Sequence, residues 1–420
     1  MITSNPESKR FIINEAQGLL NRLEQVQPFV INMPSVTAAR VPQLAQSQID
    51  MFLSKGKEKL RQQILGFIDR NSKSRDVRPE VLQRTYSFLK LSFNALLDQL
   101  DIFADVLTQR SEQDAGIVLA GLDALAKDAL AIQGSPSPEV VCYLDRGHGA
   151  AIRRARTRLP GGTLNPVAII KVPRERMVGS GIASSLIHEV GHQGAVLLGL
   201  LNSMRLVLKQ QQLKEPQATP EWASYERWIS EILADFWSVA QLGIGATLGL
   251  IGVVSLPRYF VFRMNMDDPH PFPYIRVKIS IAIGKALYPN PQWTALEKLW
   301  ESLYPLTQTD KNTIHSIKRL ESKLPAFVNL LVHHSPASLN GRKLKSLFPL
   351  EQRQAQNLRK AYRTWHSQPK LSQTARPAFA FAVIGQAKAD LQISTKRESQ
   401  LLMQLLKHWA LKKVVSGPIA

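Results

Sequence analysis

The 420-residue sequence contains a single cysteine, Cys142. One thiol excludes an intramolecular disulfide framework and every zinc site built from several thiolates, so a metal in this protein needs His and carboxylate ligands. Met1–Glu15 also lacks the apolar core of about 7 to 15 residues that a secretory signal contains. We therefore expect a protein of the reducing cytoplasm.

Acidic residues are scarce as well. The formal net charge is +20, and residues 301–420 contain 19 Lys and Arg against 6 Asp and Glu. This excess predicts affinity for a polyanion, such as a nucleic acid, or for an acidic protein. Because no RNP, zinc-finger or helix-turn-helix signature accompanies it, a solvated basic helical surface is the simpler interpretation. Binding of a polyanion, an acidic protein or a membrane through residues 301–420 is the alternative.

The first third of the sequence has the apolar periodicity of helices. Apolar residues recur at alternating steps of four and three at Leu82, Tyr86, Leu89, Phe93, Leu96, Leu100 and Phe103. This stripe predicts a helix that Pro79 can begin, and a similar stripe around Ile64 predicts a helix that ends before Asn71. An internal helical bundle explains the long stripe best, and a coiled-coil dimer seam is the alternative.

Two runs rich in β-branched residues, Val140–Leu144 and Val167–Val172, follow a turn-rich linker and predict strands. Helical patterns then cover Gly179 to about Gln212 and, after a break at two prolines, Trp222–Leu242. We therefore predict a mainly α fold with a small β-sheet. Its predicted domains are an N-terminal helical region (1–135), a mixed α and β region (136–305) and a basic helical region (306–420).

Residues 239–256 carry no charged side chain and are rich in glycine and small apolar residues. This length is marginal for a membrane span, and four glycines together with Gln241 and Thr247 interrupt the segment. We predict a buried core helix or hairpin there, with membrane contact as the alternative.

The strongest pattern is His188-Glu189-Val-Gly-His192, an H-E-x-x-H motif in a helix-compatible stretch. Four residues on a helix advance by about 400°, so both imidazoles leave one face and can ligate one Zn²⁺ at about 2.0–2.1 Å. Glu189 is turned by about 100° from His188. It can therefore act on a water held by the metal, first as general base and then as general acid. Two histidines that only form hydrogen bonds in a core are the alternative.

A catalytic zinc site needs a third protein ligand. The metzincin pattern, which places a Gly and a His shortly after the motif, is absent. On the second predicted helix, Glu231 can complete a His₂Glu set, and Asp235 one turn later can accept the N–H of a ligating His. Glu221 and Glu226 are alternative ligands, but neither is followed by a carboxylate four residues later.

These motifs resemble those of gluzincin metallopeptidases, and most closely those of the HtpX and CAAX-protease group. That group combines H-E-x-x-H with a later E-x-x-A-D and then an H-P-x-x-x-x-R stretch. The corresponding segments here are His188–His192, Glu231–Asp235 and His270–Arg276, in the same order. The resemblance covers about residues 165–280. It implies that residues 136–305 are an α+β zincin-like catalytic domain, flanked here by helical bundles, that hydrolyses peptide bonds with zinc.

The third motif supplies candidates for stabilising the oxyanion of a tetrahedral intermediate. His270 is the first candidate and Tyr274 the second. Arg276 can pair with Asp235, with Asp268 or with a substrate carboxylate. The alternative is that this proline-rich segment is only a stiff loop that closes the cleft.

Asn165–Lys171 resembles the edge strand that zincins place above the active-site helix, where an extended peptide can add by main-chain hydrogen bonds. An ordinary core strand is the alternative. Four arginines precede it and suggest acidic substrate residues near the cleavage site, although a solvated charged face is the simpler interpretation: Arg153, Arg154, Arg156 and Arg158.

The sequence thus predicts a zinc-dependent metalloendopeptidase that acts on a peptide or protein substrate. In this prediction His188, His192 and Glu231 hold Zn²⁺, Glu189 is the general base, and Asp235 orients a ligand. The alternative is a basic helical protein that binds a nucleic acid or another partner and carries a vestigial or structural zinc site.

Overall fold

The computed structural model describes residues 6–27, 35–74, 77–132, 137–145, 150–173, 179, 181–265 and 267–415. Over these residues the chain is mainly α-helical with a small sheet, as predicted. The sheet has the order β1-β3-β2 and consists of β1 (Val140–Asp145), β2 (Ala151–Arg153) and β3 (Ala168–Pro173). The chain divides into two compact units, of which the first contains Met1–Ala120, Pro138–Tyr143 and Arg153–Ile169. The three domains predicted from the sequence stay a prediction.

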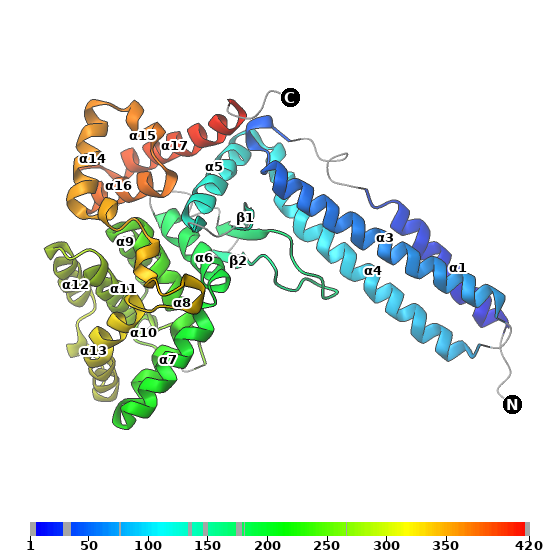
Figure 1. The fold of residues 1–420 in the computed structure, drawn as a ribbon, viewed down its shortest axis with the longest axis horizontal. Helices are drawn as coiled ribbons and strands as arrows, with labels where there is room; N and C mark the ends of the chain where they lie inside the picture. The colour runs from blue at the N-terminus through cyan, green and yellow to red at the C-terminus, as the bar shows by residue number, and fades with distance from the viewer. Residues whose placement is uncertain are drawn as a thin grey trace. The chain divides into compact units, whose positions relative to one another are not determined.

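Three long helices run side by side in the first unit (Figure 1): α1 (Pro6–Glu24), α3 (Gln43–Lys73) and α4 (Pro79–Thr108). The predicted apolar stripe lies on α4, where every member is buried except the half-buried Leu100. Most of the stripe packs against Leu19 of α1 and Ile64 of α3 in one apolar core. The prediction of an internal helical bundle is therefore confirmed.

The predicted end of α3 before Asn71 is wrong, because the helix continues to Lys73. Asn71 donates a side-chain hydrogen bond to the carbonyl of Phe67 at 2.6 Å, and Ser72 donates one to Ile68 at 2.7 Å. Polar residues that favour turns here bond back to the preceding helical turn, so they do not end the helix.

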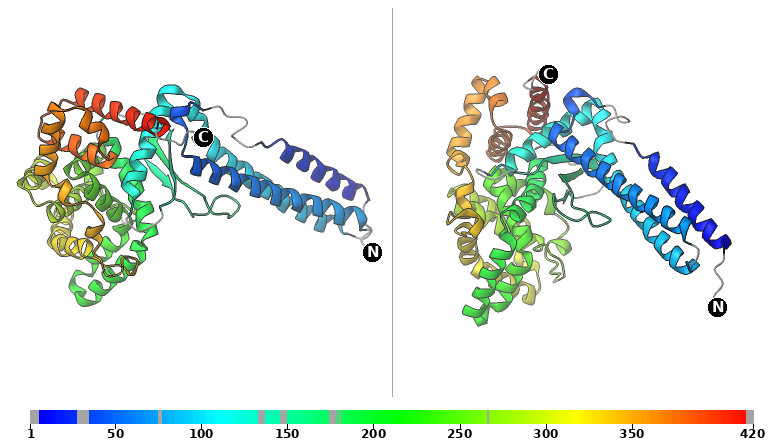
Figure 2. Two further views of the ribbon diagram at one scale, coloured as in Figure 1. Left: turned by 45° about the horizontal axis from the view of Figure 1, so that its top comes forward. Right: turned by 45° about the vertical axis from the view of Figure 1, so that its right-hand side comes forward.

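The second unit contains Gly121–Ser137, Leu144–Ile152 and Ile170–Ala420, and α5 (Gln113–Leu130) is divided between the two units. Its helices are α6 (Gly181–Leu197), α7 (Leu200–Lys214), α8 (Thr219–Leu242), α9 (Ile244–Val254), α10 (Arg258–Val261), α11 (Pro273–Leu287), α12 (Pro291–Leu303), α13 (Lys311–Val332), α14 (Ala355–Ser367), α15 (Lys370–Thr374), α16 (Pro377–Ala389) and α17 (Thr395–Val415). The almost fully buried α8 lies against α6, α7, α9 and α11. Figure 2 shows α14 to α17, orange to red, gathered against the green helices of the same unit.

The prediction of one helix from Gly179 to about Gln212 is wrong. This segment forms α6 and α7, which are separated at Gly199. Gly199 has a φ of 61°, a left-handed conformation that ends a helix and that glycine adopts without strain. The second predicted helix, Trp222–Leu242, is confirmed as part of α8.

Residues 239–256 form the end of α8 and the separate helix α9. Gly243 joins them with a φ of 60°, and α9 packs on α6 and α16. The predicted buried core helix or hairpin is therefore confirmed up to Leu250, whereas Gly252, Ser255 and Leu256 are exposed. None of the helices in the described residues combines the length and the apolar composition that crossing a membrane requires.

The expectation that Asn165–Lys171 forms an edge strand is wrong, because β3 lies between β1 and β2. The edge beside it belongs to β2, a strand of three residues that the sequence did not predict. So short a run is below the length at which alternation of apolar and polar residues can be recognised.

Candidate metal centre

Two glycines allow α6 and α8 to approach each other closely. A Cβ atom on Gly191 would lie 2.8 Å from the Cβ of Trp237, and one on Gly194 would lie 2.5 Å from the Trp237 ring. Any side chain at these positions would force the helices apart. The close packing brings both histidines of the H-E-x-x-H motif on α6 up to Glu231 on α8.

Three side chains converge between these helices. Nε2 of His188 lies 3.2 Å from Oε2 of Glu231, and Nε2 of His192 lies 3.4 Å from Oε1 of Glu231. One ligand atom from each of the three residues lies within 4.8 Å of the other two. Ligands about 2.0–2.1 Å from one tetrahedral Zn²⁺ are separated from each other by about 3.3–3.4 Å, so these distances fit a His₂Glu zinc site.

Glu231 itself points to a cation. Its Oε2 is buried and accepts no hydrogen bond of good geometry from the described residues, although imidazole nitrogens of His188 and His270 both lie 3.2 Å away. A buried carboxylate oxygen without a donor is costly, and a metal ion would satisfy it. The donor set and this oxygen together fit Zn²⁺.

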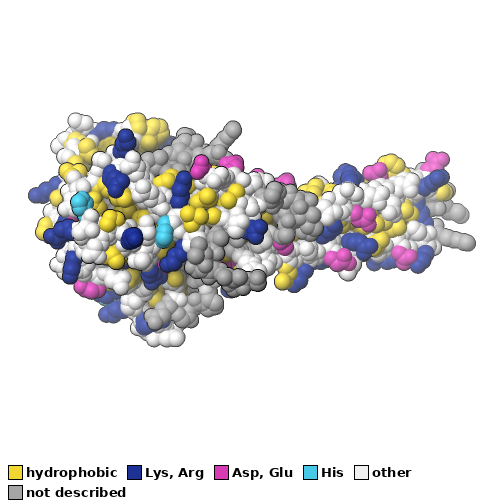
Figure 3. Space-filling model, turned by 90° about the horizontal axis from the view of Figure 1, so that it is seen from above, with side chains coloured by type: hydrophobic (Ala, Val, Ile, Leu, Met, Phe, Trp, Pro, Cys, Tyr) yellow, Lys and Arg dark blue, Asp and Glu magenta, His cyan; other side chains and the backbone are white. Residues whose placement is uncertain are grey.

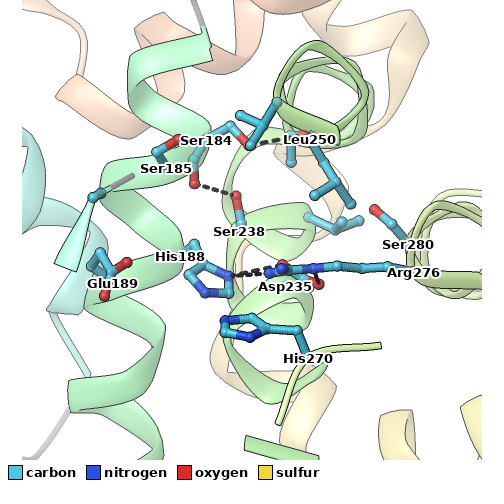
Figure 4. A pocket seen from close by; sticks show the side chains of 14 residues that line it. Ser184, Ser185, His188, Glu189, Asp235, Ser238, Leu250, His270, Arg276 and Ser280 are labelled. Carbon is cyan, nitrogen blue, oxygen red and sulfur yellow. Dashed lines mark hydrogen bonds and ion pairs between the residues drawn. The ribbon is translucent and has the colours of Figure 1, made fainter. Parts of the chain in front are cut away.

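Asp235 and Arg276 fix the orientation of His188 (Figure 4). Nδ1 of His188 lies 2.8 Å from Oδ1 of Asp235. Arg276 of α11 donates two hydrogen bonds to the same carboxylate, at 2.7 and 2.9 Å. The carboxylate keeps a proton on Nδ1, so Nε2 of His188, once it is deprotonated, can present its lone pair to a metal ion held between it and Glu231. Of the three partners considered for Arg276, the structure selects Asp235.

The charges of the centre shift the pKa values of its members. Burial disfavours the charged form of His188, but the Asp235 carboxylate outweighs this effect and raises the pKa of His188 to about 9. Burial opposes ionisation of Glu231 too, yet the positive charge of the neighbouring imidazoles of His188, His192 and His270 lowers the pKa of Glu231 to about 2. Despite burial, Arg276 and His188 hold the pKa of Asp235 below its usual value. Metal-free protein therefore carries a proton on His188 that a metal must displace.

A pocket of about 180 Å³ opens beside these residues, and Glu189 lines it together with His188 and His270. In Figure 4 the side chain of Glu189 leaves α6 on the opposite side from that of His188. Glu189 is only 8% exposed, and burial raises its pKa above the usual carboxyl range. A raised pKa makes this carboxylate a better proton acceptor near neutral pH.

His270 and Tyr274, the two candidates for oxyanion stabilisation, lie in different surroundings. His270 lies before α11, with Nδ1 2.8 Å from Oδ1 of Asp268 and Nε2 3.2 Å from Oε2 of Glu231. Its side chain is 49% exposed, so a substrate can reach it. Tyr274 is buried and stacks on Phe262 with ring centroids 5.0 Å apart, and it is not among the residues that line the pocket. The structure thus brings His270 to the centre and leaves Tyr274 outside it.

The alternative ligands Glu221 and Glu226 have other partners. Glu221 pairs with Arg319 at 2.6 Å, and Glu226 accepts a hydrogen bond from Gln212 at 2.7 Å. The sequence interpretation missed Gly191 and Gly194, which set the distance between the two helices. Their spacing of three residues beside the motif histidines was the available signal, since small residues at that spacing share a helix face.

Comparison with protein-family models finds no match to this chain, and comparisons with curated proteins and with solved structures find none either.

Proposed function

We propose that this protein is a zinc-dependent metalloendopeptidase of the gluzincin type. One observation carries the proposal: His188, His192 and Glu231, which lie on two separate helices, offer ligand atoms within 4.8 Å of one another. Asp235 behind His188 supplies the carboxylate that ligating histidines usually have, which a chance cluster would lack.

Zinc held by these three residues would polarise the scissile carbonyl and lower the pKa of a water molecule. Glu189 takes a proton from the attacking water as the new C–O bond forms, and then passes that proton to the leaving amine as the peptide C–N bond breaks. His270 donates a hydrogen bond toward the developing oxyanion, with its ring oriented by Asp268. Asp235 and Arg276 keep His188 aligned throughout.

An extended substrate has a strand edge available beside this pocket. Ala150 lines the pocket and directly precedes the edge strand β2. Main-chain hydrogen bonds to that edge would hold a peptide with its carbonyl groups in a fixed register. We therefore infer a peptide or protein substrate bound in extended form. A cytoplasmic location fits the single buried thiol of Cys142.

Zinc analysis and a matched pair of variants test this function. Purified protein should contain about one equivalent of zinc. Glu189→Gln should keep the metal and lose at least about a hundredfold in the rate of cleavage of an unfolded protein substrate. Glu226→Gln, a carboxylate of α8 that bonds Gln212, is the control and should cleave normally. Full activity of Glu189→Gln, or wild-type protein that takes up no zinc, would contradict the proposal.

A further inference from the structure

A second pocket, of about 440 Å³, lies among α14, α15, α16 and α17. Its volume falls within the range of small-molecule sites, about 300–1,000 Å³. Much of its wall is apolar and is formed by Trp365, Ile384, Ile393, Leu401 and Leu405. It shares no lining residue with the pocket of the metal centre, so its role is separate from the proposed cleavage.

One cation, Arg397, contributes to the lining of this pocket. Arg397 is exposed near the start of α17, and its side chain has no ion pair with any other residue that the structure describes. His366 and Ser394 also line the pocket and are exposed. The pocket thus combines an apolar wall with polar groups near solvent, the usual composition of a small-molecule site.

The helices around the pocket, as far as the structure describes them, offer no unpaired carboxylate to Arg397. Residues 352–420 contain 12 Lys and Arg but only Asp390 and Glu398 as acidic residues. Asp390 is paired with Arg359 at 2.7 Å, and Glu398 with Lys388 at 3.0 Å. On the face of the second unit drawn in Figure 3, dark blue Lys and Arg side chains accordingly predominate over magenta acidic ones. The acidic residues of this segment therefore leave Arg397 open to an anion from outside it.

The aromatic residues do not form an open stacking platform. Trp365 packs edge-on against Phe379, with ring centroids 6.0 Å apart, and both Tyr362 and Trp365 pack on the core of α14 and α16. Single-stranded nucleic acids need exposed ring faces along a groove of several cations. A concave aliphatic wall with one guanidinium instead fits an apolar chain that ends in one carboxylate, which a guanidinium binds through two parallel hydrogen bonds.

We propose that this pocket binds an aliphatic carboxylate, with the carboxylate on Arg397 and the chain against Ile384, Leu401 and Leu405. Octanoate titrated into the full-length protein by calorimetry is the probe, with butanoate, hexanoate and octanol as comparisons. Each added methylene should strengthen binding about threefold to fourfold while the chain is still being buried. Octanol, which lacks the charge, should bind about tenfold more weakly than octanoate.

Two variants locate the site. Arg397→Gln should weaken octanoate binding about tenfold, whereas Arg363→Gln, an exposed arginine of α14 outside the lining, should not change it. Leu401→Trp fills the pocket and should abolish binding of octanoate and octanol alike. Thermal melting checks that each variant is folded. If Leu401→Trp does not fold, the result for Arg397→Gln decides the test, because a substitution at the exposed Arg397 leaves the core intact. Absence of saturable octanoate binding, equal affinity in Arg397→Gln, or binding of a single-stranded oligonucleotide in place of octanoate would overturn the proposal.

Discussion

The metal centre and the cluster around Lys278 both gather charged groups in the second unit, but the groups differ in kind. Lys278 of α11 has a side chain only 7% exposed, and its Nζ lies 2.7, 2.6 and 3.2 Å from carboxylate oxygens of Glu297, Glu301 and Glu321. At the metal centre, by contrast, the atoms that face one another belong to two imidazoles and a carboxylate. All three are electron-pair donors once the imidazoles are neutral.

This difference indicates that the Lys278 cluster stabilises the fold, whereas the metal centre has the composition of a cation-binding site. Lys278 supplies the cation that its carboxylates need, so that cluster is complete within the chain. The guanidinium of Arg276 at the metal centre is bound bidentately to Asp235 and lies 3.7 Å from Glu231. Because Arg276 is held by Asp235, the positive charge nearest to Glu231 in metal-free protein is the proton on His188, and a metal ion would replace it. Variants at the metal centre should therefore lower zinc binding more than stability, and variants in the Lys278 cluster should lower stability more than zinc binding.

Loss of the carboxylate ligand should have the largest effect on zinc. In the proposed zinc site Glu231 supplies the only negative ligand, so Glu231→Gln should lower the zinc content from about one equivalent to below about a tenth. Metal analysis after gel filtration measures this change. Glu226→Gln, on the same helix, should retain the full equivalent. Normal zinc content in Glu231→Gln would show that the metal is held elsewhere.

Loss of the carboxylate behind the ligand should have an intermediate effect. Asp235→Asn keeps an oxygen acceptor for Nδ1 of His188 but removes the charge that orients the ring and balances Arg276. Zinc affinity, measured by competition with a chelating dye, should fall about tenfold to a hundredfold. An unchanged affinity would mean that packing alone orients His188.

The pH should change zinc affinity gradually rather than abolish it. The pKa of His188 is raised from 6.5 to about 9, so its proton stabilises metal-free protein fully below about pH 6.5, and this contribution is lost as the pH rises through about 9. Zinc has to displace that proton. Its affinity should therefore rise about tenfold per pH unit between about pH 7 and 9, measured with a competing chelator. Affinity that is flat over this interval would contradict a protonated His188.

Local periodicity sufficed to predict α4 and the end of α8 at Leu242, but it could not detect the break at Gly199. A glycine is tolerated within a helical pattern, and whether it takes a positive φ depends on how the helices on either side pack. The fixed angle between residues four apart on a helix predicted that His188 and His192 share a face. The distance between α6 and α8 depends instead on tertiary packing.

The error over Tyr274 has a simple cause. The sequence interpretation assigned no helix to this segment, whereas α11 begins at Pro273. On a helix, Tyr274 and Arg276 are about 200° apart, so when Arg276 faces Asp235, Tyr274 faces away into the core. The partner of Arg276 could not be selected from sequence, because three carboxylates were equally available until the helices were in place.

The smallest effect on zinc should come from the Lys278 cluster, where the effect on stability should be largest. Lys278→Met leaves three glutamates without their common cation, which should lower the free energy of unfolding by about 2–4 kcal/mol, less than for fully buried pairs because these carboxylates are 24–46% exposed. Lys285→Met, at a lysine 40% exposed that pairs only with Glu297 among the described residues, is the control and should cost less than about 1 kcal/mol. Urea unfolding measures both changes. Zinc content should stay near one equivalent in both variants, and its loss in Lys278→Met would mean that the two clusters are coupled rather than separate.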